Sequence, residues 1–154
     1  KDLFSKHGVM SADELEARNE IYYENYMMKL QIEARVMGDI ALNQIIPTAV
    51  KYQNTLAQNA KNLGELKLDN SEIIKSLDIL SGYTKDLTSL VHEMIEKRKE
   101  LNKIEDTHKR AIKYASDIKE AYFDKIRYAA DKLELYVDDE LWPLPKYREM
   151  LFLR

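Results

Sequence analysis

The stretch SEIIKSLDILSGYTKDLTSLVHEMIEKRKEL, residues 71–101, repeats its apolar side chains at alternating intervals of four and three residues. The positions with this spacing are Ile73, Leu77, Leu80, Thr84, Leu87, Val91, Met94, Arg98 and Leu101. Such a heptad seam forms one face of an α-helix and packs against a neighbouring helix. Because Asp69-Asn70-Ser71 offers N-caps just before it, we predict a helix over residues 71–103.

A longer helix is predicted before this one, over residues 11–63. Ser11-Ala12-Asp13-Glu14 has the composition of a capping box, and Gly64 suits a C-terminal stop. The stripe between them consists of Leu15, Tyr22, Tyr26, Leu30, Met37, Ala41, Ile45, Ala49, Tyr52, Leu56, Ala60 and Leu63. A second apolar set lies off that stripe, at Ile21, Met28, Ile32, Val36 and Ile40. We therefore expect this helix to be covered on more than one side.

Pro47 interrupts the long helix, because its ring nitrogen cannot donate to the carbonyl of Asn43. The sequence leaves open whether the chain kinks, breaks or reverses there. A continuous helix would measure about 80 Å, against about 50 Å for residues 71–103. The antiparallel partner would then end near Leu30, and the residues before it would need another cover.

A turn is expected near residues 102–106, followed by a third helix over residues 106–138. Its stripe is Ala111, Ala115, Ile118, Tyr122, Ile126, Ala129, Leu133 and Tyr136. Asp138-Asp139-Glu140 is unfavourable at a helix C-terminus, and Pro143 and Pro145 prevent helix continuation. Since no stretch alternates with the period of a strand, the predicted fold is an all-α antiparallel bundle of long helices over residues 1–140, with a non-helical tail over residues 141–154.

Composition narrows the possible functions. The 154 residues include 24 Lys and Arg and 27 Asp and Glu, giving a formal net charge of -3, and no Cys. A near-neutral charge argues against nucleic-acid binding, and no apolar run has the length of a membrane span. The lack of Cys fits a reducing compartment. We therefore expect a soluble, cytoplasmic protein.

The sequence shows no pattern typical of catalysis, cofactor binding or a metal site. His7, His92 and His108 lie far apart, and none has a second His or Cys one helical turn away. The four glycines stand singly and open no phosphate-binding loop. We predict no catalytic, cofactor-binding or metal-binding residue in this segment.

Two groups of residues are candidates for an interface. Tyr22, Tyr23 and Tyr26 are of a type enriched at interfaces, although core packing explains them slightly better. The tail residues Trp142, Leu144, Met150, Leu151 and Phe152 are unusually apolar for a chain end. The tail either docks between subunits or closes one end of its own bundle, and the sequence does not distinguish the two.

Several motifs resemble a known family in order along the chain. They are LFSKHGV (3–9), EIYYENY (20–26), IIPTAVKY (45–52), KLEL (132–135) and VDDELWPLPKYRE (137–149). Together they resemble the C-terminal helical region of the type III glutamine synthetases, which are bacterial glutamate–ammonia ligases. The family's catalytic barrel has no counterpart among these residues, so the catalytic domain is expected upstream.

The resemblance implies a parent enzyme that makes glutamine from glutamate, ammonia and ATP with a divalent metal, Mg or Mn, in a cytoplasmic homo-oligomer. The segment would then have a structural and assembly role, with its own catalytic domain and other subunits as partners. The alternative is a free-standing helical scaffold or adaptor that binds a protein partner by helix packing.

Overall fold

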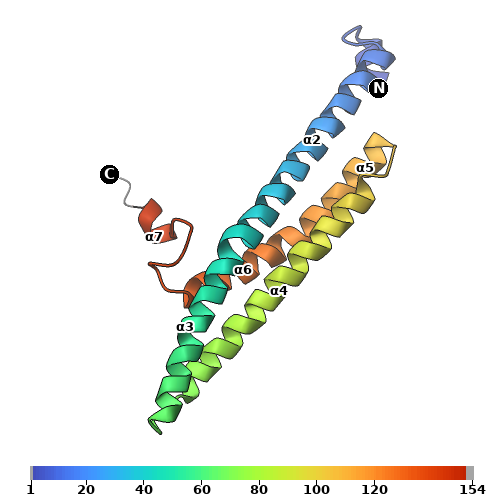
Figure 1. Ribbon diagram of the computed structural model, residues 1–154. Helices are drawn as coiled ribbons and strands as arrows, with labels where there is room; N and C mark the ends of the chain where they lie inside the picture. Colours follow the sequence, from blue (N-terminus) through green and yellow to red (C-terminus); the bar gives the residue numbers. More distant parts are fainter. Residues whose placement is uncertain (1, 152–154) are drawn as a thin grey trace.

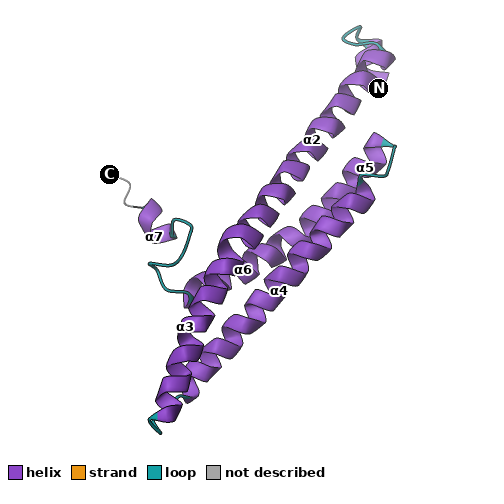
Figure 2. Cartoon of the chain, in the orientation of Figure 1, coloured by secondary structure: helices purple, strands orange, loops and turns teal. Residues whose placement is uncertain are grey.

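The structure, a computed structural model, describes residues 2–151 and consists of three long helical segments with a short helix near each end (Figure 1). Among these residues there is no β-strand, as Figure 2 shows, so the predicted all-α bundle of long helices is confirmed. No helix within the described part combines the length and apolar composition needed to cross a bilayer.

The first segment is one continuous helix made of α2 (Ala12–Ile40), the π-helical η1 (Ala41–Ile45) and α3 (Ile46–Glu65). It begins at a capping box, in which the Glu14 N–H donates to the Ser11 hydroxyl at 3.2 Å and the Ser11 N–H donates to the Glu14 carboxylate at 2.8 Å. The bonds from the Ser11 backbone and then its hydroxyl hold the pKa of Glu14 below its usual value.

Pro47 is accommodated by the π-helical turn just before it. The Ile46 N–H bonds to the carbonyl of Ala41, five residues earlier, and the backbone stays in the right-handed helical region at Ile45 and Ile46. Pro47 thereby falls in the first turn of α3, where a missing N–H is tolerated. The chain runs on from α2 into α3 and does not reverse (Figure 1).

The second segment, α4 (Ser71–Leu101), runs antiparallel to the long helix and packs on α3. The connection turns back at Lys67, which has a φ of 58°. The third segment combines α5 (Thr107–Tyr114), the π-helical η2 (Ala115–Phe123) and α6 (Asp124–Tyr136). It returns along α2 and α4, so the middle of the molecule is a three-helix bundle. The short helices are α1 (Asp2–Lys6) and α7 (Tyr147–Met150).

The tail differs from the sequence prediction in one detail, because α7 forms a single helical turn after Pro145. The carboxylate of Glu149 accepts a 3.2 Å bond from the Lys146 N–H, which satisfies a donor at the start of that turn.

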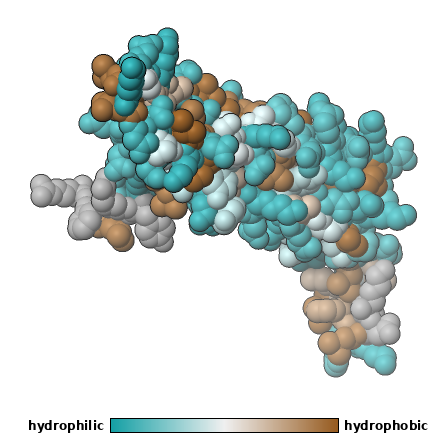
Figure 3. Space-filling model, turned by 90° about the horizontal axis from the view of Figure 1, so that it is seen from below, coloured by the Kyte–Doolittle hydropathy of each residue, from teal (hydrophilic) through white to brown (hydrophobic). Residues whose placement is uncertain are grey.

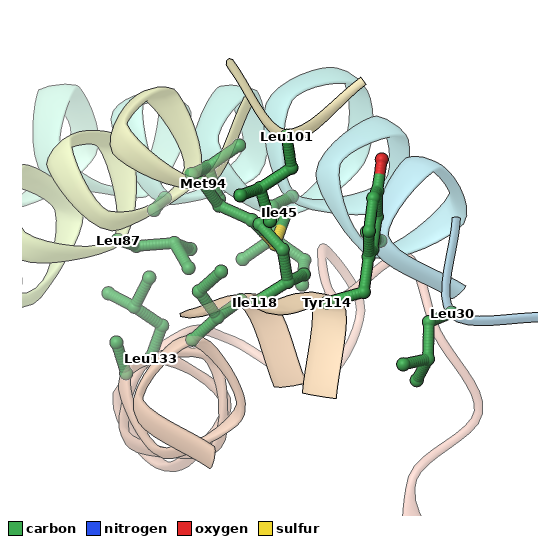
Figure 4. Packing of buried hydrophobic residues seen from close by; sticks show 14 of the residues in the cluster. Leu30, Ile45, Leu87, Met94, Leu101, Tyr114, Ile118 and Leu133 are labelled. Atoms are coloured by element: carbon green, nitrogen blue, oxygen red, sulfur yellow. The ribbon is translucent and has the colours of Figure 1, made fainter. Parts of the chain in front are cut away.

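The core is apolar and lies where the three segments overlap. Its largest fully buried side chains are Leu80, Leu87, Val91, Met94, Tyr114, Ile118, Ile126 and Leu133. Figure 4 shows Ile45 from the long helix and Met94 from α4 meeting Ile118 of the third segment. The heptad seam of residues 71–101 thus supplies the central layer of the core through Leu80, Leu87, Val91, Met94 and Leu101.

A polar network joins the three segments at the end of α4. The Gln31 side-chain amide donates to the Asn102 carbonyl oxygen at 3.0 Å and to the Tyr114 hydroxyl at 3.2 Å, and Tyr114 donates to Asn102 at 2.6 Å. Burial raises the pKa of the Tyr114 hydroxyl. The end of α4 therefore lies beside Gln31, as the helix lengths predict.

Gly82→Ala is expected to stabilise the chain by about 1 kcal/mol, because alanine has the higher helix propensity and gives the unfolded chain less freedom to lose. A Cβ built at Gly82, inside α4, meets no atom within 4 Å. Urea unfolding followed by circular dichroism measures the change. Gly8→Ala is the control, because Gly8 has a φ of 63° and alanine there should destabilise the chain. A lower midpoint for Gly82→Ala would contradict this expectation.

Candidate interaction surface

The tyrosines of α2 divide between the bundle and the surface. Tyr23 and Tyr26 are partly buried against the core, whereas Tyr22 is largely exposed. The ring of Tyr23 meets the ring of His108 edge-on, with centroids 4.5 Å apart. The third segment therefore covers part of α2 beyond the end of α4. An interface role for these tyrosines remains a prediction, and Tyr22 is the one exposed enough to contribute a large surface.

The first half of the tail packs on its own bundle. Trp142 is only 9% exposed and belongs to the core cluster, and Leu144 is partly buried against it. The Trp142 backbone N–H donates to the backbone carbonyl of Asp138 at 3.0 Å. Lys146 fastens the return of the chain, since its ammonium donates to the carbonyl of Glu134 at 3.1 Å and pairs with the Asp139 carboxylate.

The second half of the tail stands away from the bundle (Figure 1). Met150 and Leu151 are 51% and 70% exposed. Phe152, the remaining tail residue predicted to contribute to an interface, lies outside the described residues. The two readings of the tail thus apply to different parts of it: the Trp142 region closes the bundle, and Met150 and Leu151 are available for contact with another body.

The second apolar set of α2 forms an exposed stripe. Ile21, Met28, Ile32 and Val36 are 57%, 55%, 55% and 50% exposed. Their spacing of seven, four and four residues places them on one face of the helix, which we call the α2 stripe. The core-facing residues Leu30 and Ala34 are buried. The cover that the sequence predicts on a second side of this helix is not provided by the described residues of this chain.

An apolar groove adjoins the stripe, between α2 with η1 and the third segment. It has a volume of about 520 Å³ and shares Ile32 and Val36 with the stripe. The opposite wall is formed by Phe123, Ile126 and Ala130. Among the described residues that line it, only Glu33 and Arg127 carry charge. The stripe and the groove therefore form one continuous apolar surface.

Charged pairs occur on other parts of the surface, between apolar side chains such as Ile74 and Leu135. Figure 3 shows hydrophilic residues over much of the side seen from below, with apolar residues in separate groups. On α4, Lys75 pairs with Glu72 at 2.7 Å and Lys99 with Glu96 at 2.6 Å, and all four side chains are largely exposed. Such pairs one helical turn apart are typical of a helix face in contact with water.

A second concavity, of about 530 Å³, lies where the start of α2 passes the turn before α5. It is lined by the carboxylates of Glu16, Glu20, Glu105 and Asp106, with Tyr23 and His108. Within residues 2–151 the structure contains no group of three or more His, Cys, Asp or Glu side chains placed to hold a metal ion.

Sequence reasoning identified one wall of the groove and missed the other. Ile32, Val36 and Ile40 were recognisable as an apolar set off the main stripe. Phe123 and Ala130 were not, because which side of the third helix faces α2 depends on how the two segments are brought together. The sequence signal for this wall was an apolar residue next to the predicted core positions Tyr122 and Ile126.

Comparison with known proteins identifies relatives of the whole chain. Residues 1–64 match a family model described as the glutamine synthetase C-terminal domain. A glutamine synthetase from Bacteroides fragilis is 39% identical over 95% of this chain. A type-3 glutamine synthetase from Dictyostelium discoideum and a glutamine synthetase from Butyrivibrio fibrisolvens are 27% and 28% identical over 99% and 98% of it.

The match covers only a small part of each relative. It spans 21% of the Bacteroides and Dictyostelium proteins and 22% of the Butyrivibrio protein. The chain thus spans about a fifth of the length of the curated relatives that it matches.

Proposed function

Because this chain matches the C-terminal region of the glutamine synthetases over almost its whole length, we propose that it is the non-catalytic C-terminal helical region of a type III enzyme, with a structural and assembly role. The type III assignment is supported by the similarity to the Dictyostelium type-3 glutamine synthetase and by the motifs quoted above. By this proposal the parent joins ammonia to glutamate with ATP and Mg or Mn, in a cytoplasmic homo-oligomer.

The observation that carries the assembly role is the combination of a well-packed core with an uncovered apolar surface. The core consists of apolar side chains together with Tyr114 and Trp142. The α2 stripe and groove nevertheless expose large apolar side chains together, which is typical of a surface that contacts another body. ATP and metal binding belong to the rest of the parent chain in this proposal.

Deleting this segment from the parent enzyme tests the proposal. We expect the truncated enzyme to form particles with fewer subunits than the full-length enzyme, because it lacks the apolar surface through which the bundle contacts the assembly. Light scattering coupled to size exclusion measures the particle mass. The isolated 154-residue chain should be helical by circular dichroism and inactive in γ-glutamyl transfer.

Two results would contradict the proposal. A truncated parent with an unchanged number of subunits per particle would remove the assembly role, and γ-glutamyl transfer by the isolated chain would remove the non-catalytic assignment. An open reading frame without a catalytic region would favour the alternative, a free-standing helical adaptor, which the relatives do not favour.

A further inference from the structure

The α2 stripe and the groove lie side by side on the same part of the long helix. The stripe runs from Ile21 to Val36, and the groove continues it through Ile40, Ala41 and Ile45 into η1. The combined surface is therefore convex along α2 and concave where α2 meets the third segment. Because burial of Ile and Phe side chains is favourable, several of them together can hold a stable contact.

We propose that this surface, the α2 stripe with the groove, is where the catalytic body of the parent glutamine synthetase docks. The inference rests on the proposed function and names the surface through which it operates. The body is the occupant with the most support, since about four-fifths of each curated relative lies outside the matched region. That part of the parent is also the neighbour that every copy of this segment has.

The distribution of charged side chains supports docking through this surface. The exposed face of α4 carries paired ions, such as Lys97 with Glu100 at 3.0 Å and Lys99 with Glu96 at 2.6 Å, which are typical of a face in contact with water. The groove carries only Glu33 and Arg127 among its described lining residues, both at positions next to apolar ones. The partner that fits is an apolar helix or loop with few charges.

The test is made in the full-length parent with the double substitution Ile32→Glu and Val36→Glu. Both side chains are half exposed and glutamate has good helix propensity, so the bundle itself should stay folded. In the parent, we expect amide exchange along residues 21–36 to become about tenfold faster or more, because charges at a docked apolar surface weaken the contact. Ile32→Ala with Val36→Ala is the milder variant and should show a smaller change in the same direction.

The matched control is Ile74→Glu with Ile112→Glu. Ile74 and Ile112 are 50% and 53% exposed, close to the values for Val36 and Ile32, but they lie on α4 and α5 outside the proposed surface. These substitutions should leave the exchange of residues 21–36 in the parent unchanged. A control that accelerates exchange as much as the test variant would show that the effect is not specific to this surface and would overturn the proposal.

Other outcomes separate this inference from the proposed function. If deleting the segment disrupts the parent but Ile32→Glu with Val36→Glu does not alter exchange or particle mass, the surface is assigned wrongly and the assembly role stands. If the isolated chain is a dimer that these substitutions convert to a monomer while the parent is unaffected, a second copy is the occupant and the proposal is overturned. If deleting the segment does not change the assembly of the parent, the proposed function is wrong, and the docking proposal that rests on it is wrong as well.

Discussion

Tyr114→Ala is expected to destabilise the bundle by about 3 to 5 kcal/mol, the range for removing a large buried aromatic side chain. Tyr114 is fully buried and lies where the long helix, α4 and the third segment meet (Figure 4). Its removal leaves a cavity between three helices whose backbones cannot all move inward. Because small domains are stable by only about 5 to 15 kcal/mol, the loss is a large fraction of the total.

Tyr114→Phe separates packing from hydrogen bonding. The ring stays, and the hydroxyl that links Gln31 to Asn102 is removed. Gln31 and Asn102 still bond to each other at 3.0 Å, so we expect a loss of only about 1 kcal/mol. Urea unfolding of the two variants and the unsubstituted chain measures both values. Equal losses in the two variants would show that the hydroxyl, and not the ring, dominates at this position.

Trp142→Ala is expected to lower the stability of the isolated chain by about 3 kcal/mol, because the indole is buried against the bundle. Its loss also frees the chain between Val137 and Lys146, which the indole helps to hold. Thermal unfolding followed by circular dichroism measures the effect. The result would assign the Trp142 region of the tail to the core of this segment.

Leu151→Ala is the matched control in the same tail. Leu151 is 70% exposed, so its truncation should change the stability of the isolated chain by less than about 0.5 kcal/mol. A Trp142→Ala variant with unchanged stability, in a parent that assembles poorly, would instead show that the indole contacts another subunit. The docking interpretation of the whole tail would then be restored.

The helices could be predicted from sequence because their causes are local. The capping box at Ser11 and Glu14 and the heptad spacing of residues 71–101 each involve residues within a few positions of one another. The response to Pro47 could not be predicted, because a kink, a break and a π-helical turn can each accommodate a residue without a backbone N–H. The structure has the π-helical turn, in which the Ile46 N–H moves to the carbonyl of Ala41.

In the third helix, the spacing of apolar residues does not predict every buried position. The sequence stripe includes Ala115 and Tyr136, whereas the structure buries Tyr114 and Val137 in the corresponding places. Tyr114 is drawn inward by partners on two other segments, Gln31 and Asn102. Val137 is buried where the chain leaves the helix with an extended backbone. The burial of both residues depends on tertiary contacts, which cannot be predicted from the spacing of apolar residues in one helix.

The candidate interaction surface could also be predicted only in part from the sequence. The α2 stripe was recognisable because its residues share one helix, and the apolar tail was recognisable by composition. The sequence did not predict that Trp142 would be buried and Leu151 exposed, since this difference depends on where the chain turns after Pro143 and Pro145. The groove required the third segment to be placed beside α2.

The continuous helix from Ala12 to Glu65 is long enough for a small rotation at one point to displace its far end. It crosses the whole bundle, and its end at Glu65 is about 36 Å from Ala41, where the groove meets η1. A tilt of about 5° pivoting at Ala41 would move that end by about 3 Å, the rise of two helical residues. By the proposal above, a small adjustment at the α2 stripe and groove would therefore become a larger displacement at the tip formed by α3 and α4.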